Sequence, residues 1–117
     1  MKQPERFPIF IELLNIAYRG DQKLITRSKN ALNWSPSGRY TLFDMAADEV
    51  IVAALYLFNK KDFYQFRNLG AATIERLYDF MHSEAGELFF KERGLDQKEI
   101  QINARRMIAK EYSGYNF

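Results

Sequence analysis

The sequence predicts an all-α protein, a compact bundle of about five to seven helices. Apolar side chains recur at helical spacing along most of the chain, most regularly at Ile74, Leu77, Tyr78 and Met81. The β-branched run from 50 to 52 stands among alanines, which are strong helix formers, so it also favours a helix. No segment has the pattern of a strand.

Length and composition predict one globular domain over residues 1–117. Hydrophobic residues make up 47% of the chain and charged residues 27%, which is a globular balance. We expect an extra N-terminal helix in 1–22, a core in 23–95, and a helix with an aromatic tail in 96–117. The net charge is only +2, so any nucleic-acid binding must depend on a local basic patch.

Several classes of chemistry find no support in the sequence. The chain has no cysteine, which excludes disulfides and thiolate metal sites. It has no phosphate loop and no nucleophile elbow. We interpret the only histidine, His82, as a capping or surface residue, and Asp44 and Asp48 as solvated acids. We therefore expect no enzyme, no cofactor and no metal.

The N-terminus has no signal-peptide pattern, and the longest apolar run, Val50 to Phe58, is too short to span a bilayer. We expect a soluble, cytoplasmic protein. The predicted first helix, 7–18, carries apolar residues off its main stripe at Ile11, Ile16 and Tyr18. Such a helix is either buried or meets another chain, so a homodimer through it is a hypothesis.

The next two helices are predicted from their capping residues. Ser28 is a plausible N-cap for a short helix whose Leu32 and Trp34 point inward. Thr41, followed by Asp44, predicts the start of the longest helix, which would run to Phe58.

The C-terminal half is predicted in the same way. We expect Asp62 to cap a short helix over 63–68, and further helices over 71–82 and 84–92. Asp96 and Glu99 form a capping-box pattern for the last helix. Residues 112–117 form an aromatic tail with no regular period.

Residues 66–77 predict two helices joined by a tight turn at Gly70. Glycine tolerates positive φ, so we expect Gly70 to adopt it or to stand in close backbone contact. The helix that follows would present free N–H groups, which suit phosphate oxygens. A plain connection within a helical core explains the same pattern.

Three short motifs follow one another between residues 24 and 82. Residues 25–32 contain Arg-Ser, any residue, Asn, a small residue and Leu; 40–45 contain Thr-x-x-Asp; and 67–77 contain Asn-Leu-Gly followed by Thr-Ile-Glu-Arg-Leu. Together they resemble the C-terminal domain of the bacterial RNA polymerase alpha subunit, a helix-hairpin-helix domain. The resemblance does not cover the first or the last helix.

The resemblance implies contact with the DNA minor groove through the opening motif and with phosphates through the hairpin. The matching positions here are Arg27, Asn30, Gly70 and Thr73. That family has two lysines in the hairpin where this chain has Ala71 and Ala72, and each lost lysine removes a phosphate contact.

A basic stretch from 19 to 39 supplies further cations, among them Lys23 and Lys29, although a solvated loop face explains it equally well. The expected function is a non-enzymatic module that binds double-stranded DNA through Arg27, Asn30 and the Gly70 hairpin. The alternative is a protein-interaction module on the same scaffold, which uses the first helix or the aromatic tail.

Overall fold

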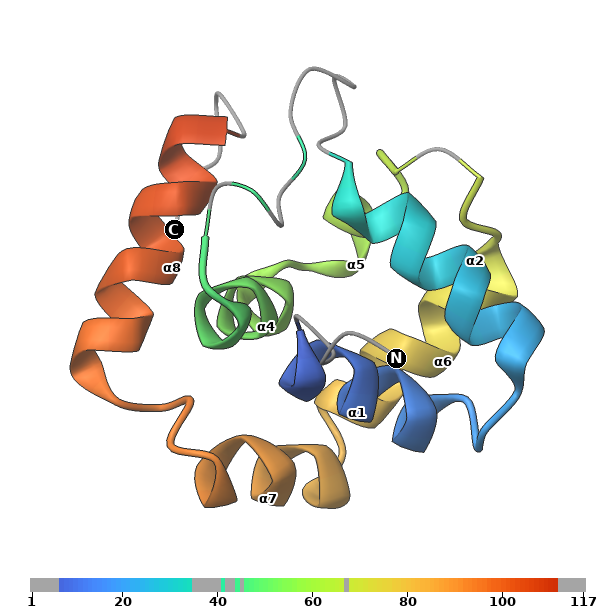
Figure 1. Ribbon diagram of the computed structural model, residues 1–117, viewed down its shortest axis with the longest axis horizontal. Helices are drawn as coiled ribbons and strands as arrows, with labels where there is room; N and C mark the ends of the chain where they lie inside the picture. Colours follow the sequence, from blue (N-terminus) through green and yellow to red (C-terminus); the bar gives the residue numbers. More distant parts are fainter. Residues whose placement is uncertain (1–6, 35–40, 42–43, 45, 67, 112–117) are drawn as a thin grey trace, which may run out of the picture.

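The computed structural model describes residues 7–34, 41, 44, 46–66 and 68–111. These residues form seven helices and no strand, which confirms the predicted all-α class (Figure 1). Trp34 and Thr41 form one isolated bridge. The helices are α1 (Pro8–Ala17), α2 (Gln22–Asn33), α4 (Asp48–Leu57), α5 (Lys60–Phe63), α6 (Ala71–Met81), α7 (Glu84–Glu92) and α8 (Lys98–Glu111).

Two central helices, α1 and α4, organise the core. Helix α1 packs against α2, α4 and α6, and α4 also packs against α8. In Figure 1, α8 lies at the left of this pair, α2 and α6 at the right, and α7 below. Residues 50–55 of α4 are all buried, which explains why its sequence is apolar on every side.

Most of the apolar surface of α1 is buried against other helices of the same chain. Phe10, Leu13 and Leu14 are fully buried, and so is Tyr18 just beyond the helix. Ile16 is the one large apolar side chain of α1 that is exposed, at 44%. The apolar surplus that suggested a homodimer is therefore mostly covered by this chain's own helices.

The predicted start of the second helix at Ser28 is wrong. Helix α2 begins at Gln22, because the Asp21 carboxylate caps it by accepting from the N–H groups of Lys23 and Leu24 at 3.1 and 3.3 Å. Ser28 is fully buried in the middle of the helix. Trp34, predicted to point inward, is 49% exposed.

The predicted long helix from Thr41 to Phe58 is also wrong at its start. Thr41 bonds the Asp44 carboxylate, as the sequence suggested, but α4 begins only at Asp48, after Ala47 in extended conformation. The longest described helix is α8, with 14 residues. Residues 42, 43 and 45 lie outside the described part.

The connection before α6 differs from the predicted hairpin. Asn59 and Asp62 form a capping box for α5, which ends at Phe63, so the predicted helix over 63–68 is absent. Gly70 has φ −71° and serves as N-cap of α6, and a Cβ there would meet no atom within 4 Å. The prediction that Gly70 has positive φ or a close backbone contact is therefore wrong. In this connection the residue with left-handed backbone is Asn68, with φ 63°.

The last three helices agree with the sequence. Ile74, Leu77 and Met81 of α6 are fully buried, as the stripe predicts. Helix α7 matches the predicted residues. Helix α8 begins at Lys98, so Gln97 directly precedes it and not the predicted cap Asp96, and the helix is buried through Ala104, Met107 and Ile108. The aromatic tail, 112–117, lies outside the described residues.

Candidate nucleic-acid interface

The candidate interface begins with the outer face of α2. Lys23, Arg27 and Asn30 recur at i, i+4 and i+7, which places them on one side of the helix, and all three are exposed. Ile25, Ser28 and Leu32 are buried on the opposite side. The amphipathic sequence of α2 therefore fixes which of its side chains face outward.

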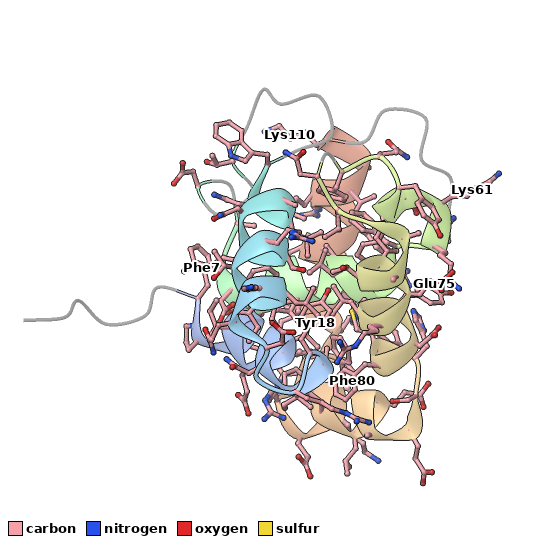
Figure 2. All side chains as sticks on the ribbon, turned by 90° about the vertical axis from the view of Figure 1, so that its right-hand side faces the viewer. Phe7, Tyr18, Lys61, Glu75, Phe80 and Lys110 are labelled. Atoms are coloured by element: carbon pink, nitrogen blue, oxygen red, sulfur yellow. The ribbon has the colours of Figure 1, made fainter. Side chains whose placement is uncertain are left out.

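A buried hydrogen-bonded chain joins α2 to α6 through Tyr18. The Ser28 hydroxyl donates to the Tyr18 oxygen at 3.0 Å, and the Tyr18 hydroxyl donates to the Thr73 carbonyl at 3.1 Å. Figure 2 shows α2 and α6 on the same side of the molecule, with Tyr18 between them. These two hydrogen bonds connect the middle of α2, through Tyr18, to the first turn of α6.

The N-terminus of α6 is open to solvent. Gly70, Ala71 and Ala72 are exposed, no side chain caps the helix, and its first turn contains no acidic residue. The first N–H groups of a helix lack partners within the helix and carry a partial positive charge. This end of α6 is therefore compatible with a phosphate oxygen.

Arg76 adds a cation that the sequence analysis did not select. Its guanidinium lies over the Tyr18 ring, 5.6 Å from the centroid. Burial raises the pKa of Tyr18, while the hydrogen bond from Ser28 and the positive charge of Arg76 act in the opposite direction. Arg76 lies one helical turn after Thr73, and that spacing from the predicted hairpin is the signal that could have identified it.

The predicted site residues separate into two groups. Lys23, Arg27, Asn30 and Gly70 are all exposed. Lys29 is half-buried, and Thr73 is 7% exposed with its carbonyl bonded to Tyr18. The Thr73 side chain is thus part of the core rather than of the surface.

Two titratable residues, Asp48 and His82, make contacts that hold the fold together. Asp48 is 9% exposed rather than solvated, and its carboxylate accepts from the N–H groups of Ile9 and Phe10 at 2.7 and 3.0 Å. His82 is exposed, as predicted; its ring stacks against Tyr56 and lies tilted against Tyr78. Within the described residues, no cluster of three potential metal ligands occurs, and no helix has the length and apolarity needed to cross a membrane.

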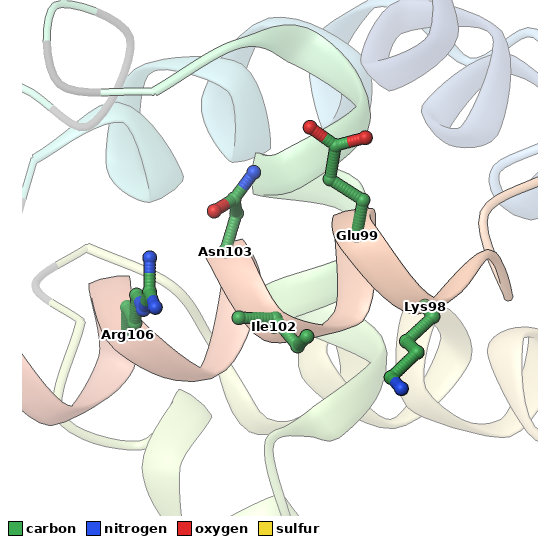
Figure 3. Close-up of a pocket in the computed structure, with 5 residues that line it drawn as sticks. All are labelled: Lys98, Glu99, Ile102, Asn103 and Arg106. Carbon is green, nitrogen blue, oxygen red and sulfur yellow. The ribbon is translucent and has the colours of Figure 1, made fainter.

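A shallow hollow of about 430 Å³ lies along the outer face of α8 (Figure 3). Its described lining residues all belong to this one helix: Lys98, Glu99, Ile102, Asn103 and Arg106. Two cations and one acid leave it weakly positive. Helix α8, which carries the hollow, and α2 lie at opposite sides of the molecule (Figure 1).

Comparisons with protein-family models, curated proteins and solved structures give no match for this chain. The resemblance to the RNA polymerase alpha C-terminal domain therefore rests on the three sequence motifs alone.

Proposed function

We propose that the protein is a non-enzymatic nucleic-acid-binding module that contacts double-stranded DNA through the outer face of α2 and the N-terminus of α6. The observation that carries this proposal is the Ser28–Tyr18–Thr73 chain. It fixes the position of α2, whose outer face bears Lys23, Arg27 and Asn30, relative to α6, whose exposed N-terminus has no side-chain cap. Cations and free N–H groups are the usual partners of DNA phosphates.

Arg27 is the central residue of this surface, since it lies between Lys23 and Asn30 along the exposed face of α2. An arginine suits a narrow minor groove, where the negative potential is enhanced. Arg76, held over the Tyr18 ring, supplies a further positive charge that can attract the DNA phosphates. With alanines at 71 and 72, the expected affinity is low and strongly dependent on salt.

The test is a titration of fluorescently labelled duplex DNA at about 50 mM salt, where electrostatic binding is strong. Arg27→Ala should weaken binding at least about fivefold. Arg106→Ala is the matched control, because it removes the same charge from the exposed face of α8. Absence of wild-type binding, or equal losses in the two variants, would contradict the proposal.

A second candidate function is protein–protein interaction through the same surface. The exposed Ala71 and Ala72 favour it, because they leave the start of α6 without charged side chains. In that case the duplex titration shows no binding, and the fluorescence of the labelled duplex is the same with wild type and with Arg27→Ala.

A further inference from the structure

Trp34 is the single tryptophan of the chain, and it lies at the surface. It is the C-cap residue of α2, with φ −88° and ψ 141°, and its indole is 49% exposed. Its backbone forms a bridge with Thr41, which ties the end of α2 to the next segment of the chain. The helix and the bridge together fix where the indole is presented.

Trp34 continues the outer face of α2. Counting from Lys23, Arg27 and Asn30 follow at i+4 and i+7 on one arc of the helix, and Trp34, the C-cap residue directly after it, continues this spacing at i+11. The buried Ile25, Ser28 and Leu32 occupy the opposite arc. At a rise of about 1.5 Å per residue, Trp34 stands about 10 Å beyond Arg27 along the axis.

A row of cations, an amide and an exposed indole is suited to a nucleic acid with unpaired bases. Cations along the row attract the phosphates, and an aromatic ring offers a face on which a base can stack. A base inside a duplex has both faces covered by its neighbours, so only an unpaired or terminal base can use the indole. Along the helix axis Arg27 lies about 10 Å from Trp34 and Lys23 about 16 Å from it, so the phosphates that they bind would belong to nucleotides other than the stacked one.

We propose that Trp34 stacks on an unpaired base while Lys23 and Arg27 hold phosphates farther along the same strand. This inference rests on the proposed function, and it extends the ligand class from duplex DNA to nucleic acid with a single-stranded segment. The base is recognised by its flat face, so DNA and RNA share the required chemistry.

The experiment uses the intrinsic fluorescence of Trp34, which reports on this site alone because the chain has no other tryptophan. Four probes are titrated: an octamer of deoxythymidine, an octamer of uridine, an abasic octamer with the same number of phosphates, and a blunt duplex. We expect strong quenching with the thymidine or uridine octamer, little with the abasic octamer, and weaker quenching with the duplex, whose only uncovered base faces are those of its two terminal pairs. Equal quenching by the abasic octamer would overturn the proposal, because it would show an effect of charge alone.

Affinities of the variants are measured by anisotropy of the labelled octamers. Trp34→Leu should weaken binding of the thymidine octamer about fivefold or more, whereas Trp34→Phe, which keeps a ring, should lose less. Leu88→Ala is the control for removal of an exposed apolar side chain, since Leu88 is 54% exposed on α7. Thermal melts establish that each variant is folded.

The outcomes separate this inference from the proposed function. Duplex binding that depends on Arg27, combined with no loss in Trp34→Leu on either octamer, would overturn the stacking role and leave the proposed function standing. Absence of binding to duplex and octamers alike would contradict both.

Discussion

At the residue scale, a few polar side chains join helices that are distant in the sequence. Asp48 lies at the first turn of α4 and caps the backbone of α1, 38 and 39 residues away. Tyr18 links α1 to both α2 and α6. Each of these groups is buried or nearly so, and loss of one partner would leave the others unsatisfied.

Asp48→Ala should lower the free energy of unfolding by about 1–3 kcal/mol, because the N–H groups of Ile9 and Phe10 lose their acceptor. Asp48→Asn keeps one carbonyl acceptor and should cost less. Urea denaturation of both variants measures the difference. An unchanged midpoint in Asp48→Ala would contradict the capping role.

Tyr18 should make stability depend on pH in the alkaline range. Burial raises its folded-state pKa above the ordinary 10.0, so the phenol ionises more easily in the unfolded chain. Its contribution is complete below pH 10.0 and decreases as the pH rises from there through the folded-state pKa.

The measurement is urea denaturation of wild type and Tyr18→Phe between about pH 7 and pH 11, a range that spans the phenol titration. The variant should be less stable by about 1–3 kcal/mol at neutral pH, and the gap should narrow above pH 10.0. Tyr64→Phe, at a side chain that is 51% exposed, is the control and should follow wild type. A constant gap would contradict the assignment.

At the scale of elements, capping residues and close packing decide where helices begin and meet. Because Asp21 and Asn59 act as caps, α2 and α5 begin at residues other than the predicted ones. Among the described glycines, Gly86, at the corner between α6 and α7, is the one whose Cβ would meet backbone atoms. A Cβ there would lie 1.9 Å from the Phe80 carbonyl oxygen, whereas one at Gly70 would meet nothing.

Gly86→Ala should therefore destabilise the protein by about 1–3 kcal/mol or more, because backbone atoms cannot move aside as a flexible side chain can. Gly70→Ser is the matched substitution and should be neutral or slightly stabilising, since serine is a good N-cap. Thermal melts compare the two. Equal effects would show that the α6–α7 corner is looser than these contacts require.

At the scale of the whole molecule, the proposed interface and the α8 hollow lie on different sides of the core. With a net charge of only +2, the molecule has little long-range attraction for nucleic acid. Among the described residues of the proposed interface, binding must depend on a few cations, namely Lys23 and Arg27 on α2 and Arg76 on α6.

Three cations release few counterions, so the logarithm of the DNA association constant should fall with the logarithm of salt concentration with a slope of about −3 or shallower. Titrations of duplex DNA at several salt concentrations give this slope. Arg76→Ala should make it shallower by about one, and Arg106→Ala should leave it unchanged. A much steeper slope would indicate that other basic residues contribute.

The sequence by itself determined the all-α class, the extents of α6 and α7, and the buried stripes of α6 and α8. These features follow from local periodicity and from apolar residues that one helix face must bury. The sequence also predicted that Arg27 would be exposed, and it is exposed.

Only the tertiary structure decided the rest, because the deciding contacts join residues far apart in the chain. Ser28 is a buried link rather than a cap because Tyr18 of α1 reaches it, and Thr73 leaves the candidate surface because its carbonyl accepts from the same phenol. Asp48 is a cap rather than a solvated acid because α4 begins where α1 needs an acceptor. Trp34 faces outward because α2 begins at Gln22 and buries Ile25, Ser28 and Leu32 on the opposite side.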